Sequence, residues 1–400
     1  MKIRIAVETP LIIGGSDDML EFDFFQESGH LKAIDLEATA SVINEADALK
    51  WQNHIRNLIT LKGIPGRSLQ RDQSGTGAAK VSEIMTFYQN LARTGTLKTF
   101  TNEIELGGGD FWRFGGVTPT LYHITQAQSG RLMEPYIPGS SVKGAIRRSV
   151  LFDLIGRGQF IVSEGRNAKA SDLILENVSG FNDRHAFEDS PVFRISGKPS
   201  PQNDLMRFIT VSDFIPDGKF TLSLVQLSRK TGTREQKSNY LAVTSGKFTG
   251  DISLNRSILL QAIGEKLKSD DYRNLASVLN VSESDIKGIS GESNSAFARV
   301  EEKIVKYLIE KVTGYAVING RISGYDVEGR HGIIILGFGK GSPLNTVLNA
   351  NSSFSAEALR KLTAMRKRNP KSIASPKTKW VVQWKGGESR PGLCTMEVIS

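Results

Sequence analysis

Apolar and polar residues alternate near the start of the chain, where Ile3 and Ile5 fall on one face of an extended segment. This period of two predicts a β-strand within 2–13. Apolar segments at 20–25 and 31–34 flank a Ser-Gly-His turn and predict a hairpin. Further apolar segments of strand length occur at 121–124, 207–213, 220–225, 240–243, 332–336, 380–384 and 393–398. A Pro-Asp-Gly turn predicts that 207–213 and 220–225 pair as a hairpin, and the last two segments are expected to form another.

Apolar residues at three- and four-residue spacing predict helices in other parts of the chain. These helices are expected at 36–61, 81–91, 140–154, 256–268, 272–279, 296–312 and 355–365. In the first of them, Leu49 and Trp51 are expected in the core. Strands and helices mix without a regular βαβ period. This favours an α+β architecture that is built twice, rather than a doubly wound sheet.

A polar segment at 156–202 shows neither period and contains many turn-forming residues. It is interpreted as long loops and as the boundary between two units. The expected units are 1–200, with a helical insertion, and 201–400, with a glycine-rich loop and a basic C-terminal segment.

The segment 135–154 combines a turn with a basic amphipathic helix. Two prolines and Gly139 predict an extended approach and a tight turn, after which Ser140 or Ser141 can cap the helix. Val142, Ala145, Ile146, Val150 and Leu154 mark a buried face, while Lys143, Arg147 and Arg148 are the cations of its first turns. Gly144 weakens a helix by about 1 kcal/mol relative to Ala, which suggests that a ligand approaches the backbone there. A helix N-terminus with cations is typical of phosphate binding, and a solvated basic face is the alternative.

Composition favours a polyanionic partner. The 400 residues include 51 Lys and Arg against 42 Asp and Glu, a net charge of +9, which suits nucleic acid or an acidic membrane surface. There is no run of 18 apolar residues and no signal-peptide core at the start. A single cysteine, Cys394, excludes an internal disulfide and a multi-cysteine zinc site. The simplest interpretation is a cytoplasmic protein that binds nucleic acid and not a membrane.

Three further segments are candidate RNA contacts. Gly14, Gly15 and Ser16 follow the first strand and could offer backbone N–H groups to phosphate, although a plain turn is the alternative. Gly337, Phe338, Gly339, Lys340 and Gly341 form a glycine loop in which Phe338 could stack on a base, or else a bulge packed against a helix. The basic run from Arg366 to Lys379 includes Lys377 and could bind phosphate or be merely solvated.

Enzymatic chemistry has weak support in the sequence. The five histidines lie far apart and show no metal-ligand spacing. Cys394 lies in an apolar run and is expected in the core. Asp17 and Asp18 could hold a divalent cation for phosphodiester cleavage, with a polar turn as the favoured alternative. Asp213, at a predicted strand end, is expected to make a structural hydrogen bond.

The sequence PYIPGSSVKGAIRRSVL at 135–151 resembles the signature helix start of the RAMP superfamily, the RNA-binding subunits of CRISPR–Cas effector complexes. TPLIIGGS at 9–16, RFITVSDF at 207–214 and LGFGKGS at 336–342 also match the family pattern. Their order and the chain length resemble the subunit that caps the 3′ end of the guide RNA in type III-A Csm complexes. Phe338 and Lys340 stand where many relatives have Trp and Thr, which leaves the detailed contacts of the glycine loop open.

The resemblance implies two ferredoxin-like, RNA-recognition-type modules with helical and loop insertions, which bind single-stranded guide RNA through its backbone. It implies a non-catalytic subunit without a cofactor or metal, which caps crRNA, supports its maturation and acts in antiviral defence. The implied partners are crRNA, target RNA close to the guide, the backbone and small subunits of the complex, and host nucleases. The residues expected to contact RNA are Gly14, Gly15, Ser16, Gly139, Ser140, Ser141, Lys143, Arg147, Arg148, Gly337, Phe338, Gly339, Lys340, Gly341, Lys377 and Lys379.

Overall fold

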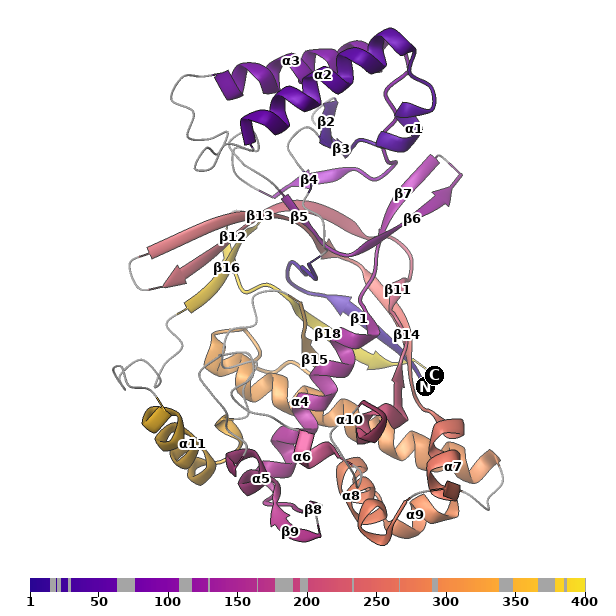
Figure 1. Ribbon diagram of the computed structural model, residues 1–400, viewed down its shortest axis with the longest axis vertical. Helices are drawn as coiled ribbons and strands as arrows, with labels where there is room; N and C mark the ends of the chain where they lie inside the picture. The colour runs from indigo at the N-terminus through magenta and orange to yellow at the C-terminus, as the bar shows by residue number, and fades with distance from the viewer. Residues whose placement is uncertain are drawn as a thin grey trace.

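The structure of the protein is a computed structural model in which two β-sheets lie between an upper and a lower group of helices (Figure 1). This arrangement confirms the predicted α+β mixture of helices and sheets. The structure describes residues 1–14, 19, 23–27, 30–62, 76–107, 117–128, 130–163, 165–176, 190–194, 201–231, 234–265, 267–289, 294–337, 348–365, 378–384 and 387–399.

The first sheet joins strands from both ends of the chain in the order β10-β14-β1-β18-β15, and β11 pairs with β14. Its strands are antiparallel to their neighbours. Ile3 and Ile5 of β1 are fully buried, which confirms the predicted strand face. The two termini lie side by side because β1 and β18 are neighbours (Figure 1). The strands are β1 Lys2–Val7, β10 Ile209–Val211, β11 Ile215–Pro216, β14 Lys247–Leu254, β15 Ile333–Ile335 and β18 Leu393–Val398.

The second sheet has eight strands, and its longest members form the β12–β13 hairpin. β12 also pairs with β16 in antiparallel and with β4 in parallel orientation. The predicted N-terminal hairpin is confirmed as β2 and β3. The strands are β2 Phe24–Glu27, β3 His30–Ala33, β4 Ile104–Leu106, β5 Val117–Pro119, β12 Thr221–Thr231, β13 Arg234–Ser245, β16 Thr378–Trp384 and β17 Gly387–Ser389. Separate two-stranded hairpins are formed by β6 Tyr122–Ala127 with β7 Gly130–Pro135, and by β8 Phe160–Ser163 with β9 Arg166–Lys169.

The lower helices share the main hydrophobic core with the first sheet. The core contains Ile5 of the sheet together with Val142 and Ile146 of one helix and Leu308 of another. These helices are α4 Gly139–Gly156, α5 Ala170–Glu176, α6 Ser190–Phe193, α7 Arg256–Glu265, α8 Ser269–Leu279, α9 Glu283–Gly288, α10 Asn294–Ser323 and α11 Ser352–Met365. α4 contacts both β10 and α10, and α10 contacts β15, so these elements form one packed unit (Figure 1).

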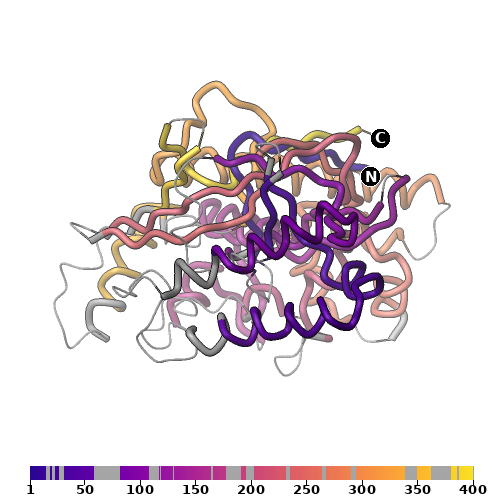
Figure 2. Tube along the Cα trace, turned by 90° about the horizontal axis from the view of Figure 1, so that it is seen from above, coloured from indigo at the N-terminus to yellow at the C-terminus, as the bar shows by residue number. Residues whose placement is uncertain are grey.

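The upper helices form an insertion with a small core of its own. They are α1 Leu36–Ala40, α2 Glu45–Lys62 and α3 Thr76–Arg93, and α2 and α3 run side by side (Figure 2). The predicted single helix at 36–61 is two helices: α1 ends at Ala40 with Ser41 as its C-cap, and Asn44 accepts a hydrogen bond from the N–H of Asp47 at the start of α2. Trp51 is buried and its indole N–H donates to the Tyr88 hydroxyl at 3.1 Å. Leu49 is 56% exposed, so its predicted core position is wrong.

Two predicted hairpins are wrong because the chain changes sheet at the predicted turns. β10 pairs with β14 in the first sheet, whereas β12 belongs to the second. In the same way β16 pairs with β12 and β17, whereas β18 pairs with β1 and β15. The partner of each strand depends on contacts distant in sequence, which the turn residues do not reveal.

The polar segment 156–202 is not only loops, since it contains β8, β9, α5 and α6. The hairpin of β8 and β9 packs against α8, and α5 packs against α4. Leu173 and Ile174 of α5 are buried, and they supply the apolar contacts that place this segment in the main core. The division into units at residue 200 stays a prediction.

Candidate nucleic-acid interface

The start of α4 is held by backbone pairing and by a carboxylate. The N–H of Ile137 donates to the Phe214 carbonyl at 3.0 Å, and the N–H of Phe214 donates back at 2.9 Å. Pro138 is the N-cap residue and offers no side-chain cap. Instead, the N–H of Gly139 donates to Oδ1 of Asp213 at 2.8 Å. The structural role predicted for Asp213 is thereby confirmed.

The predicted serine cap is wrong, because Ser140 and Ser141 lie inside the first turn of α4. The serine positions are therefore two and three residues too late to cap the helix. Gly139 is needed for close packing: a Cβ there would lie 2.2 Å from the Val211 carbonyl oxygen and 2.6 Å from that of Ser212.

One row of α4, at four-residue spacing, faces the protein and is called here the closed row: Gly139, Lys143 and Arg147. The Arg147 guanidinium lies 2.5 Å from Asp204 Oδ2 and 4.3 Å above the centre of the Phe193 ring. Burial lowers the pKa of Lys143, the nearby Asp204 raises it in part, and Arg147 lowers it again. The closed row therefore joins α4 to the segment around Asp204, and the positive charge of Arg147 already has a protein partner.

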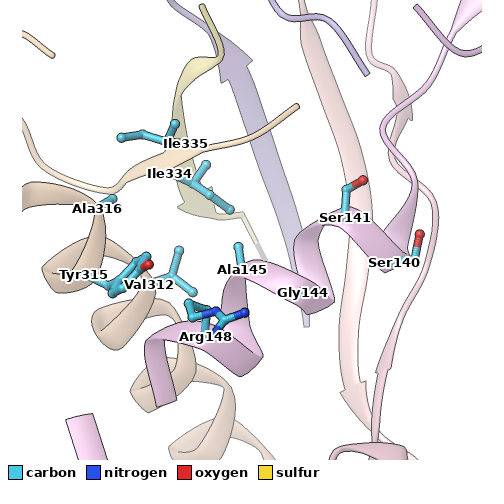
Figure 3. A pocket seen from close by; sticks show the side chains of 10 residues that line it. All are labelled: Ser140, Ser141, Gly144, Ala145, Arg148, Val312, Tyr315, Ala316, Ile334 and Ile335. Atoms are coloured by element: carbon cyan, nitrogen blue, oxygen red, sulfur yellow. The ribbon is translucent and has the colours of Figure 1, made fainter. Parts of the chain in front are cut away.

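The next row of α4, offset by one residue, borders a pocket and is called here the open row: Ser140, Gly144 and Arg148. The pocket has a volume of about 280 Å³ and lies between α4, α10 and β15 (Figure 3). It is lined by Ser140, Ser141, Gly144, Ala145, Arg148, Val312, Tyr315, Ala316, Ile334 and Ile335. A Cβ on Gly144 would meet no atom within 4 Å, so the α4 backbone is bare at this point.

Arg148 is the cation of the open row, and no residue in the described part of the chain forms an ion pair with it. The ring of Tyr315 lies in the same pocket. The Phe152 ring packs edge-on against it, with 5.3 Å between the ring centres and 78° between the ring planes. Burial raises the pKa of the Tyr315 hydroxyl, and the charge of Arg148 lowers it in part. The pocket thus combines a cation, an aromatic ring, two serines and apolar walls.

Sequence reasoning identified the α4 side of this pocket but not the α10 side. The helix predicted at 296–312 ends before Gly314, whereas α10 continues to Ser323 and includes Tyr315 and Ala316. A Cβ on Gly314 would meet no atom within 4 Å, so this glycine marks no tight contact and does not end the helix. The apolar spacing of Val312 and Ala316 was the available signal for the continuation.

Gly14 and Gly337 are the described residues of the two glycine segments, and Gly337 packs against Ile12, two residues before Gly14. Gly14 pairs with Thr120 as an isolated β-bridge. Gly337 has a φ of +73°, and a Cβ there would lie 2.2 Å from the Ile12 carbonyl oxygen, so only glycine fits. Since Ile334 and Ile335 line the pocket, Gly337 follows the pocket wall by two residues.

Several predicted contact residues lie outside the described residues: Gly15, Ser16, Phe338, Gly339, Lys340, Gly341 and Lys377, together with Asp17 and Asp18. Lys379 lies in β16 opposite Lys230 of β12, and its side chain is not described. The contacts expected of all these residues stay predictions.

Enzymatic features are few in the described part of the chain. No three or more His, Cys, Asp or Glu side chains are placed there to share a metal ion. Cys394 is fully buried, which confirms its predicted place in the core. Among the helices described, none is long and apolar enough to span a bilayer.

Comparison with known proteins identifies the family pattern. The RAMP superfamily model matches residues 4–314. A chain of a type III-A Csm–crRNA–target RNA ternary complex is similar to this chain with a TM-score of 0.59 and 17% identity, covering 99% of this chain and 100% of its own. Csm5 of T. onnurineus is similar with a TM-score of 0.49 and 16% identity, covering 98% and 99%. Comparison with curated proteins gives no match.

Proposed function

Because this chain belongs to the RAMP superfamily, we propose that it is an RNA-binding subunit of a type III-A CRISPR–Cas effector complex. The fold it shares with a chain of a Csm–crRNA–target RNA complex supports this proposal. The finer role that we propose is to cap the 3′ end of the crRNA and to support its maturation in antiviral defence. The motif order in the sequence, from TPLIIGGS to LGFGKGS, supports that role.

The partners that we propose follow from this role. They are crRNA, target RNA close to the guide, the backbone and small subunits of the complex, and host nucleases, all in the cytoplasm. The net charge of +9 is favourable for the RNA partners. No cofactor is needed, because holding a guide strand requires only contacts to its backbone and bases.

The observation that carries the proposal is the difference between two neighbouring arginines. Arg147 already neutralises Asp204, whereas Arg148 faces the pocket with no ion-pair partner in the described part of the chain. A guanidinium can bind phosphate oxygens through two parallel hydrogen bonds. Ser140 and Ser141 add hydroxyl donors to the same pocket. Contacts from these groups to the RNA phosphates carry no sequence information, as a subunit that accepts every guide requires.

The test is the affinity of the full-length protein for single-stranded RNA, measured by fluorescence anisotropy over a range of salt concentrations. We expect Arg148→Ala to weaken binding and to reduce the salt slope by about 0.7, the value for one phosphate contact on a single strand. Arg273→Ala is the matched control, since Arg273 is an exposed cation on α8 and its loss changes the net charge equally. Equal slopes for Arg148→Ala and the wild type, with folding intact, would contradict the proposed site.

We further propose that the chain does not cut RNA. The alternative is a metal-dependent ribonuclease that uses Asp17 and Asp18. Incubation of the purified protein with labelled RNA in Mg²⁺ or Mn²⁺ distinguishes the two. Cleavage that is lost in the Asp17→Ala, Asp18→Ala double variant would establish the ribonuclease and overturn the non-catalytic role.

A further inference from the structure

We propose that the pocket between α4, α10 and β15 takes one unstacked nucleobase of the bound RNA, while Arg148 binds the adjoining phosphate. This inference rests on the RNA binding proposed above and adds what the site does with a base. Its evidence is the size, lining and preorganisation of the pocket, none of which phosphate binding requires.

The size of the pocket suits a single flat group. Pockets that enclose drug-sized ligands range from about 300 to about 1,000 Å³, and this one has about 280 Å³. A strand of several nucleotides or a duplex cannot enter such a volume. One base that leaves the stack can enter, and RNA-binding proteins commonly recognise single strands with their bases splayed out.

The side chains that line the pocket do not suit a phosphate group as its only ligand. Val312, Ala316, Ile334 and Ile335 form apolar walls on the side of the pocket opposite the serines of α4 (Figure 3). An apolar wall gives a phosphate group no hydrogen bond, so an anion would stay at the α4 side. A base has two apolar faces and gains from leaving water there. The lining therefore divides into a phosphate side on α4 and a base side on α10 and β15.

The aromatic ring of the pocket is fixed before any ligand binds. Phe152 packs edge-on against Tyr315, with 5.3 Å between the ring centres. Tyr315 is 8% exposed, and its ring lines the pocket. A ring that is already ordered loses little conformational entropy when a base stacks on it. Stacking on an aromatic ring contributes about 1–3 kcal/mol per base and tolerates any base.

The pocket has little means of reading a sequence. Its lining contains no Asn, Gln, Asp or Glu side chain to pair with base edges, and Arg148, which could pair with guanine, is engaged by the adjoining phosphate in this proposal. Ser140 and Ser141 can donate to or accept from any base. We therefore expect the pocket to require a base but to show little preference among the four.

The test compares a short oligouridylate with an abasic RNA of the same length, which keeps every phosphate and lacks every base. The pocket is filled by Gly144→Leu, because a side chain there enters open space and improves the helix. Gly314→Leu is the matched control, since Gly314 is also exposed on a helix with open space at its Cβ and does not line the pocket. Affinity is measured for the full chain by fluorescence anisotropy.

We expect Gly144→Leu to weaken oligouridylate binding by about fivefold to a hundredfold, the range that stacking of one base gives, and to leave abasic RNA binding unchanged. Gly314→Leu should bind both RNAs like the wild type. If Gly144→Leu weakens both RNAs equally, or neither, the base pocket is wrong while RNA binding stands. If the wild type binds neither RNA, the proposed function fails as well. Ala316→Leu narrows the pocket from the α10 side and should repeat the pattern if the Gly144 variant misfolds.

Discussion

The closed and open rows of α4 begin one residue apart and follow the same four-residue spacing, yet they have opposite surroundings. In the closed row, Gly139 touches backbone carbonyls and Arg147 is paired with Asp204. In the open row, Gly144 has no neighbour at its Cβ position and Arg148 borders a pocket. Each row contains one glycine and one arginine, so residue type alone does not separate a packing role from a binding role.

The comparison teaches that a cation is available to RNA only when the fold leaves it unpaired. Arg147 would have to give up a short ion pair and a ring contact before it could bind a phosphate. Breaking such a partly buried pair leaves Asp204 without its partner, which is costly. Arg148 has no ion pair to break within the described part of the chain, so its binding to a phosphate does not carry this cost. We therefore expect the closed row to determine stability and the open row to determine RNA affinity.

The largest expected effect is on the free energy of unfolding, when the glycine of each α4 row is replaced by alanine. Gly139→Ala would place a Cβ against two backbone oxygens, and we expect a loss of about 3 kcal/mol, the upper end for overpacked sites. Gly144→Ala meets no atom and should gain up to about 1 kcal/mol from helix propensity. Urea unfolding of both variants measures the difference. Similar stabilities would show that the two rows do not differ in packing.

The sequence was sufficient for the elements that depend on local pattern. Four of the five residues predicted for the buried face of α4, Val142, Ile146, Val150 and Leu154, are fully or almost fully buried, whereas Ala145 is partly buried and lines the pocket. Helical periodicity records which residues share a face, and burying that face requires no knowledge of the partner. The same reasoning located β1 and the N-terminal hairpin of β2 and β3.

The sequence was insufficient wherever a residue depends on a distant partner. The partner of Arg147 is Asp204, 57 residues away, and nothing in the local pattern distinguishes Arg147 from Arg148. Tyr315 reaches the pocket from α10, a helix that begins 155 residues after the start of α4. The wrong hairpins have the same cause, because strand pairing is decided by the packing of whole sheets and not by the turn.

The next effect concerns the ion pair of the closed row. Arg147→Ala should lower the free energy of unfolding by about 2 kcal/mol, because Asp204 loses a charged hydrogen bond and Phe193 loses the guanidinium above its ring. RNA affinity should change little. Arg148→Ala is the reciprocal control, with near wild-type stability and weakened RNA binding. Urea unfolding and fluorescence anisotropy of the same two variants distinguish the stability role of one row from the RNA-binding role of the other. An Arg147→Ala protein that is stable but binds RNA poorly would reverse the roles assigned to the two rows.

The smallest effect comes from Lys143, the middle residue of the closed row. Burial lowers its pKa in the folded protein below the ordinary 10.5, so the unfolded chain binds this proton more tightly than the folded one. Wild-type stability should therefore rise with pH between the lowered pKa and 10.5. Lys143→Met removes the buried charge and should be slightly more stable than the wild type at neutral pH, with an advantage that shrinks across this window.

Urea unfolding at several pH values measures this advantage of Lys143→Met. Lys247→Met, at an exposed lysine of β14, is the control for the loss of one positive charge. If Lys143→Met were instead less stable than the wild type at neutral pH, with a deficit that shrank as the pH rose above 10.5, the charge of Lys143 would be stabilised by Asp204 more than it is penalised by burial. Lys143 would then be a second stabilising partner of the Asp204 carboxylate beside Arg147. Both cations of the closed row would in that case stabilise the folded protein through Asp204.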